Sequence, residues 1–330
     1  NWENVTGVRE VFWGDASGPY HEDLNPEGLG YAVYGDVLFD PWCTNEACIS
    51  RNPVIIVPGL LGTEMSKPRE NDEPEKLWLD ILRNITDAGD EFMDALQFNS
   101  DLTPSETLTV GDVVRKITFL SKSYDYSDGL IEEFQTQGYI EGTDLFLFPY
   151  DWRYGVNEDN VNKLKQKIAD VLEETNAEKV DIIAHSTGGL LVKKYVVENP
   201  EDNHIDKAVF VGVPNTGAPK AIKALIEGDS FGVPLLADGE MKKISKNLPV
   251  AYDLLPSEQY FNAKGSYVKI VTKPLFAHTP EELNFEEADD FLVNDHELNE
   301  QALTNARNLH TADFDNYDMR TAGVDLYALD

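Results

Sequence analysis

The chain has 330 residues, of which 42% are hydrophobic and 10% aromatic, which is enough for a large packed core. It carries 60 acidic side chains against 27 Lys and Arg, a formal net charge of −33. A surface this negative repels phosphate backbones and anionic membranes, which excludes nucleic acid as an expected partner and favours neutral or zwitterionic substrates. The sequence shows no apolar run of transmembrane length and no recognisable signal peptide.

Residues 1–50 are rich in Gly, Pro, Asp and aromatic residues, and we expect them to form strands and loops packed on the core. They include both cysteines of the chain, Cys43 and Cys48. Two thiols cannot complete a four-ligand zinc site, and their spacing is not that of a redox motif. A small loop disulfide is the simplest interpretation and predicts a secreted or otherwise extracytoplasmic protein, with two unpaired thiols as the alternative.

Residues 51–215 alternate between strand and helix patterns. Buried strands are predicted at 53–57, 145–148, 179–183 and 208–213, each a short apolar or β-branched run. Between the second and third of these strands, Asn157 is placed to cap a long helix with a regular apolar stripe. Strands and helices at this spacing predict an α/β fold, with a mostly parallel sheet and helices on both faces.

The regular alternation ends near residue 216. Residues 216–320 combine short helical stretches, many Gly and Pro, and acidic runs, and are expected to form a cap and lid region. A last core strand is predicted within 321–330, where the sequence ends. The run from Asp313 to Asn316 only weakly resembles a calcium loop, because it lacks the glycine and the distal glutamate. We therefore predict no metal and no cofactor.

The most informative segment runs from Ala184 to Gly189, in the sequence AHSTGG. It joins a predicted buried strand to a predicted helix, and very small residues flank Ser186 two positions away on each side. This is the nucleophile-elbow pattern, in which a turn tight enough to lift a serine above a sheet leaves no room for neighbouring side chains. An ordinary strand–turn–helix with a serine as the helix cap would also fit.

A serine nucleophile needs amide donors for the oxyanion that forms during acyl transfer. The amide of Thr187, directly after the serine, is one candidate. The glycine turn after the first buried strand offers a second donor, for which Leu60 is best placed, although that turn could be purely structural.

Five motifs occur in an order that resembles the lecithin:cholesterol acyltransferase family. They are VPGLLG at 57–62, LWLD at 77–80, PYDWR at 149–153, AHSTGG at 184–189 and GVPNTG at 212–217. The resemblance covers roughly residues 50–260 and implies an α/β-hydrolase-type fold with a lid near 216–245 that could touch a lipid interface. It also implies Ser186 as the acyl-accepting nucleophile, with the amides of Leu60 and Thr187 as the oxyanion hole.

Further residues are expected to support this site, among them Gly59 and Gly188 in the two turns. Asp151 and Arg153 would point the same way from an extended segment, where a structural ion pair is favoured over direct catalysis. His185 is interpreted as a packing residue whose ring points away from the serine. The catalytic acid and histidine are not identified: in this fold they follow late strands, and His310, within a helical stretch, is expected to be a satisfied surface histidine.

The sequence thus favours a serine-dependent lipid acyl hydrolase or acyltransferase, represented here by a fragment that lacks its acid and histidine. Two alternatives remain open. One is a catalytically silent lipid-binding module that kept the fold, and the other is an esterase for small soluble esters.

Overall fold

A computed structural model describes residues 17, 19–22, 25–32, 51–70, 73–78, 80, 91–119, 122–230, 237–271 and 281–329. The two cysteines, Cys43 and Cys48, and residues 231–236 of the expected lid lie outside these ranges, so the predicted disulfide is not described. Within residues 1–50, the structure describes two short paired strands, β1 (Pro19–Tyr20) and β2 (Gly30–Ala32). The packing of that extension on the core therefore stays a prediction.

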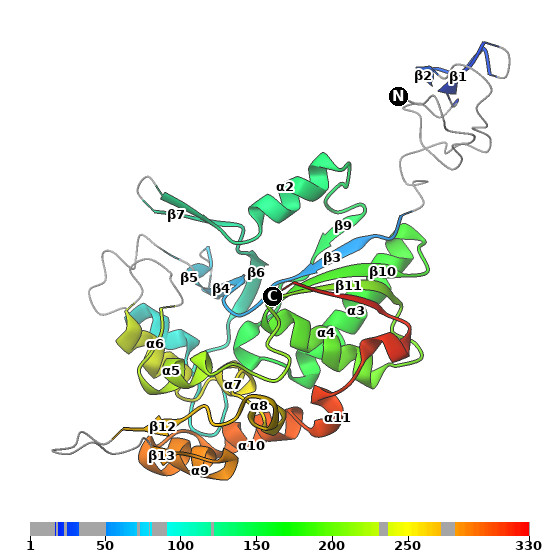
Figure 1. Ribbon diagram of the computed structural model, residues 1–330. Helices are drawn as coiled ribbons and strands as arrows, with labels where there is room; N and C mark the ends of the chain where they lie inside the picture. The colour runs from blue at the N-terminus through cyan, green and yellow to red at the C-terminus, as the bar shows by residue number, and fades with distance from the viewer. Residues whose placement is uncertain are drawn as a thin grey trace.

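Five parallel strands form the central sheet, in the order β14-β11-β10-β3-β9 (Figure 1). The strands predicted from the sequence lie within it. Their bounds are β3 (Val54–Val57), β9 (Leu145–Leu147), β10 (Val180–His185), β11 (Ile205–Val211) and β14 (Asp325–Leu329).

Helices cover both faces of this sheet, and the inner strand β3 is accordingly apolar and buried on both sides. Ile55 and Val57 belong to the large cluster that includes Leu164 of α3 and Leu190 of α4. Val54 and Ile56 alternate with them and pack in a second cluster, which includes Ile131 of α2. The predicted α/β class, with helices on both faces, is confirmed; the helices concerned are α2 (Asp128–Thr136), α3 (Glu158–Thr175) and α4 (Thr187–Glu198).

The start of α3 agrees with the sequence pattern. Asn157 is its N-cap and accepts a hydrogen bond from the amide of Asn160 at 2.9 Å. Val161, Leu164 and Ile168 are each at most 2% exposed, so the predicted apolar stripe faces the sheet.

Small antiparallel sheets flank the core. The first contains β4 (Thr63–Lys67), β5 (Glu75–Trp78) and β6 (Thr109–Val113), and the second pairs β7 (Lys116–Phe119) with β8 (Lys122–Asp125). Two short 3-10 helices, η2 (Glu91–Leu96) and η3 (Trp152–Tyr154), complete this part of the chain.

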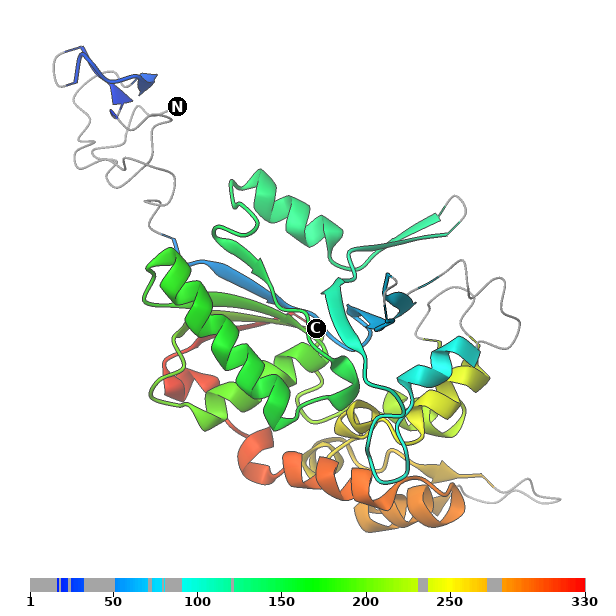
Figure 2. The same cartoon turned by 180° about the vertical axis from the view of Figure 1, so that it is seen from behind.

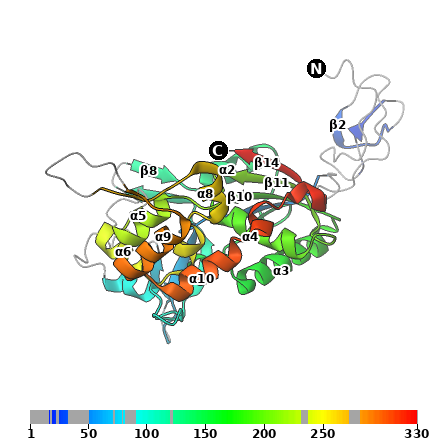
Figure 3. The ribbon, with the colours of Figure 1, turned by 60° about the horizontal axis from the view of Figure 1, so that its bottom comes forward.

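The region after β11 is a set of short helices gathered on one side of the sheet (Figures 2 and 3). None of the helices in the described ranges combines the length and apolar character needed to cross a bilayer. The elements are α5 (Lys220–Ile226), α6 (Asp238–Ser245), α7 (Pro249–Asp253), α8 (Glu258–Lys264), β12 (Lys269–Ile270), β13 (Glu281–Glu282), α9 (Phe285–Asp290), η4 (Phe291–Asp295), α10 (Glu300–Leu309), α11 (Ala312–Asp315) and η5 (Met319–Ala322).

Candidate active site

Ser186 lies in the one-residue turn between β10 and α4. Its backbone has φ 51° and ψ −125°, a left-handed conformation that a residue with a side chain rarely adopts. The Ser186 side chain forms no helix-capping hydrogen bond, so the capping-serine alternative does not describe this turn. Its amide instead donates to the carbonyl of Val211 at 3.0 Å, which ties the turn to the neighbouring strand.

Small residues around this turn are required by close packing. A Cβ on Gly188 would lie 2.4 Å from the carbonyl oxygen of Pro58, and one on Gly189 would lie 2.2 Å from a methyl group of Val213. Ala184 is fully buried. The first turn of α4 therefore presses against the ends of β3 and β11, and larger residues would push Ser186 out of place.

The turn after β3 lies next to the turn that holds Ser186. Gly62 donates its amide to the carbonyl of Gly59 at 3.0 Å, which closes a tight loop around Leu60 and Leu61, and Leu61 has φ 63°. Thr187 is the first residue of α4, and amides in the first turn of a helix have no acceptor within the helix. The two predicted oxyanion donors thus come from loops that meet at the carboxyl end of the sheet.

Ser186 and Leu60 line one cavity of about 340 Å³. Most of the cavity wall is apolar, and seven of its 18 lining residues come from α5, α6 and α7. The residues that line it are Leu60, Leu61, Tyr126, His185, Ser186, Gly212, Pro214, Ala218, Lys220, Ala221, Ala224, Asp229, Met241, Ser245, Leu248, Val250, Ala251 and Leu254. A half-buried serine at the edge of an apolar cavity is the arrangement that an acyl ester substrate requires.

His185 differs from its interpretation as a packing residue. It is exposed and lines the cavity beside Ser186, because the alternation of β10 ends at the turn and leaves this ring at the sheet edge. Desolvation by the surrounding protein lowers the pKa of His185, which favours the neutral imidazole. Within the described residues, Ser186 Oγ has no hydrogen-bond partner, and no metal-binding group of three or more His, Cys, Asp or Glu is found.

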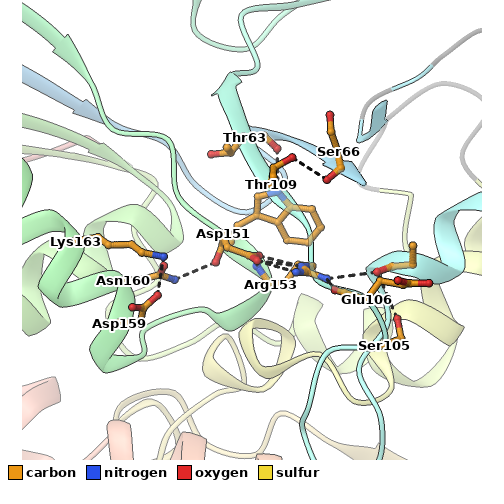
Figure 4. A network of polar contacts seen from close by, with 12 residues as sticks. Thr63, Ser66, Ser105, Glu106, Thr109, Asp151, Arg153, Asp159, Asn160 and Lys163 are labelled. Atoms are coloured by element: carbon orange, nitrogen blue, oxygen red, sulfur yellow. Dashed lines mark hydrogen bonds and ion pairs between the residues drawn. The ribbon is translucent and has the colours of Figure 1, made fainter. Parts of the chain in front are cut away.

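Asp151 and Arg153 form a buried ion pair (Figure 4). Arg153 donates from Nη2 to Asp151 Oδ2 at 2.8 Å and from Nε to Oδ1 at 3.0 Å, and both side chains are at most 9% exposed. The expected ion pair is therefore present, but the expected extended segment is not. Asp151 is the N-cap of η3, so the arginine folds back in a tight turn and also reaches the carbonyls of Ala95 and Glu106 at 3.4 Å.

His310 is satisfied, as expected, but it does not lie on the surface. Its side chain is fully buried, with Nδ1 at 2.6 Å from Asp315 Oδ1 and Nε2 at 2.7 Å from the carbonyl of Asp253. A carbonyl only accepts, so Nε2 carries a proton. The sequence pattern missed this cluster, because its members come from α7, from the residue that follows α10, and from α11, and they meet only in the fold.

Asp253 is a second buried group that the sequence did not single out. Its Oδ2 accepts from the amide of Val156 at 2.9 Å. Burial raises the pKa of Asp253 to about 6, although the amide of Val156 and the nearby charge of His310 oppose the shift. This carboxyl lies in α7, the helix that contributes Val250 and Ala251 to the cavity lining.

A parallel sheet with helices on both faces, and a serine in a strained turn at its carboxyl edge, define a fold of the α/β-hydrolase type. A structure search agrees: a chain in the crystal structure of the Tle4–Tli4 complex superposes with a TM-score of 0.52. That match covers 84% of this chain and 74% of the other at 16% sequence identity, and it bears on the fold alone.

Residues 77–324, well over half of the chain, match the family described as lecithin:cholesterol acyltransferase, and the chain belongs to that family. It is similar to mouse phosphatidylcholine-sterol acyltransferase, with 25% identity over 81% of this chain and 68% of the relative. It is also similar to Arabidopsis thaliana phospholipase A(1) LCAT3, with 27% identity over 70% and 59% of the two chains. Bovine lysosomal phospholipase A and acyltransferase is 24% identical over 67% and 61%. The chain thus spans roughly half to two thirds of the length of these relatives.

Proposed function

We propose that this protein transfers acyl groups from a lipid ester, through an acyl-enzyme on Ser186, to water or to an alcohol. The observation that carries the proposal is that Ser186 and Leu60 line the same apolar cavity while the amide of Thr187 follows the serine directly. The family relatives named for acyltransferase and phospholipase activities support the same class of reaction.

In the first half of the reaction, Ser186 Oγ attacks the ester carbonyl carbon and gives its proton to a base. The carbonyl oxygen becomes an oxyanion that the amides of Leu60 and Thr187 stabilise, and the developing charge is favoured by the N-terminus of α4. Collapse of this intermediate breaks the ester C–O bond, and the base returns the proton to the leaving alcohol. Water or a second alcohol then attacks the acyl-enzyme, its proton passes through the same base to Ser186 Oγ, and the free acid or the new ester is released.

The acyl chain would lie in the cavity, against the side chains that α5, α6 and α7 contribute to its wall. Among the cavity-lining residues, the titratable side chains are Tyr126, His185, Lys220 and Asp229. Lys220 Nζ lies 3.8 Å from Asp229 Oδ2, so these two opposite charges offset each other. Together with the net charge of −33, this supports a neutral or zwitterionic lipid. Contact of residues 216–245 with a lipid interface belongs to the same proposal, as does the extracytoplasmic location, which the name of the lysosomal relative supports.

Labelling with a fluorophosphonate probe, followed by peptide mapping, tests the nucleophile. We expect the label on Ser186 in the full-length protein and no label in Ser186→Ala. Ser123→Ala, which alters an exposed serine on β8 outside the cavity, is the matched control and should label normally. Equal labelling and ester hydrolysis in Ser186→Ala would overturn the proposal.

Two further measurements separate the alternatives. A lipid-binding module without chemistry would bind vesicles yet neither label nor hydrolyse esters. A small-ester esterase would cleave acetyl esters faster than long acyl esters, whereas the proposed activity should favour longer chains. Mixed micelles with an added alcohol then report transfer against hydrolysis.

A further inference from the structure

The cavity beside Ser186 has chemically different walls. The side chains that α5, α6 and α7 contribute to it are mainly apolar. His185 and Tyr126 also line it, and both can form hydrogen bonds through the ring nitrogens and the hydroxyl. Among the described residues, neither of these two side chains has a hydrogen bond or an ion pair. Their polar atoms are therefore available to a bound molecule.

The two hydrogen-bonding side chains come from the α2 side of the sheet. Side chains alternate along β10, so His185 is on the same face as Ile183, which packs in the cluster that contains Ile131 of α2. Tyr126 lies between β8 and α2. Ala184, on the opposite face, belongs to the core cluster that includes residues of α5, α6 and α7. These three helices lie below the sheet in Figures 1 and 2, whereas α2 lies above it.

The imidazole of His185 is close to the serine side chain. A Cβ on Gly59 would lie 2.8 Å from the Ser186 Cβ and 3.1 Å from His185 Nδ1. The serine and this ring nitrogen therefore flank the same glycine, in the loop that carries Leu60. Desolvation lowers the pKa of His185 and favours the neutral ring, in which one nitrogen donates and the other accepts. Such a ring suits a hydroxyl group, which also donates and accepts.

An ester bound at Ser186 has two parts that extend from its carbonyl carbon in different directions. In the proposed reaction, the carbonyl oxygen faces the amides of Leu60 and Thr187. The acyl chain is apolar and fits the side chains from α5, α6 and α7. The alcohol part is then directed to the other side of the cavity, where His185 and Tyr126 lie.

We propose that His185 and Tyr126 form a subsite for the alcohol part of the ester, and that this subsite selects alcohols with a hydroxyl besides the reacting one, such as glycerol. This inference rests on the proposed function and deepens it. When Ser186 Oγ bonds to the acyl carbon and the ester C–O bond breaks, the leaving oxygen takes its proton from the base. An accepting alcohol would occupy the same place: its oxygen forms the new ester bond, the Oγ–acyl bond breaks, and its proton passes through the base to Oγ.

Competition between two esters in one solution tests the subsite. The full-length protein is given equal concentrations of glyceryl monobutyrate and propyl butyrate, which share the acyl group and a three-carbon alcohol, and chromatography follows the loss of each. The ratio of the two rates gives the ratio of the kcat/KM values, and it does not depend on how much of a variant is folded. We expect the unaltered protein to prefer the glyceryl ester. His185→Phe and Tyr126→Phe should each lower this preference about fivefold, the effect of one lost hydrogen bond.

Tyr124→Phe is the matched control. Tyr124 lies in β8, two residues before Tyr126, and is 38% exposed against 40% for Tyr126, but it does not line the cavity. Removal of its hydroxyl should leave both rates and their ratio unchanged.

An unchanged ratio in either cavity variant would overturn the inference, as would an equal change in Tyr124→Phe. A general base or an oxyanion donor acts on both esters alike, so a fall in both rates at an unchanged ratio would also overturn it and would assign such a role to the altered residue. Failure of the proposed function looks different: neither ester would be consumed and Ser186 would not be labelled, and the subsite would then be refuted together with the reaction.

Discussion

The backbone of Gly59 rests against Ser186: a Cβ on this glycine would lie 2.8 Å from the Ser186 Cβ and 2.9 Å from the carbonyl oxygen of His185. The loop after β3 and the turn after β10 are thereby pressed together at the sheet edge. This contact brings Leu60 to the same cavity as the serine, which neither loop could do alone.

Replacing this glycine should disturb the site directly. In Gly59→Ala the new methyl group must displace either the serine turn or its own loop, and we expect ester hydrolysis to fall at least about tenfold and stability by about 1–3 kcal/mol. The measurements are kcat with the nitrophenyl ester and urea unfolding. Gly239→Ala is the control: this glycine in α6 has open space around it, so activity should persist. Full activity in Gly59→Ala would show that the close contact is not needed.

The buried ion pair beneath the sheet edge predicts a large loss of stability. Arg153→Met leaves the Asp151 carboxylate buried without its partner, at a cost of about 3–5 kcal/mol. Arg320→Met removes the arginine of an exposed pair with Asp318, where the side chains are 70% and 41% exposed, and should change stability by less than about 1 kcal/mol. Chemical denaturation of both variants makes the comparison, and similar losses would contradict the structural role given to Asp151.

Asp253 predicts a pH dependence of folding stability. Its pKa is about 6 in the folded protein against 3.8 as reference, so between about pH 4 and 6 the folded state holds a proton that the unfolded state releases. The free energy of unfolding therefore falls as the pH rises through this window, by an amount on the order of 3 kcal/mol in total. Well above pH 6 the Asp253 carboxyl is ionised in the folded protein, and the loss in the free energy of unfolding is then complete.

Asp253→Asn should remove this contribution, because the amide is neutral and its oxygen still accepts from the Val156 amide. We expect the variant to be more stable than the unaltered protein at pH 7 and similar to it near pH 4. Thermal unfolding measured at several pH values between 4 and 8 checks this. A gain in stability that is the same at every pH would assign the effect to packing instead of to ionisation.

The wall of the cavity predicts a chain-length effect. Ala224 of α5 lines the cavity and is 5% exposed, so Ala224→Leu should fill space that an acyl chain would occupy. Hydrolysis of long-chain esters should fall several-fold, whereas acetyl ester hydrolysis should change little. A series of nitrophenyl esters from two to sixteen carbons measures the shift; an equal loss for every chain length would place the acyl chain elsewhere.

Some features of the site follow from local sequence. Small residues at positions 184 and 188 are needed wherever a serine occupies so tight a turn, and Gly188 and Gly189 do lie against neighbouring backbone and Val213. The β-branched runs before Ser186 and before Leu60 likewise predict buried parallel strands, which β10 and β3 are. Such inferences succeed because steric limits within a few residues are visible in the chain itself.

Only the tertiary structure decided which residues from distant segments of the chain contact one another. The sequence alone placed Ser186 in its turn, and it left His310 on the surface and His185 in the packing. The fold buries His310 against Asp315 and the Asp253 carbonyl, and it brings residues of α5, α6 and α7 to the cavity that Ser186 lines. The physical reason is that a local pattern states which face of an element is apolar, whereas burial and charge depend on which other element covers that face.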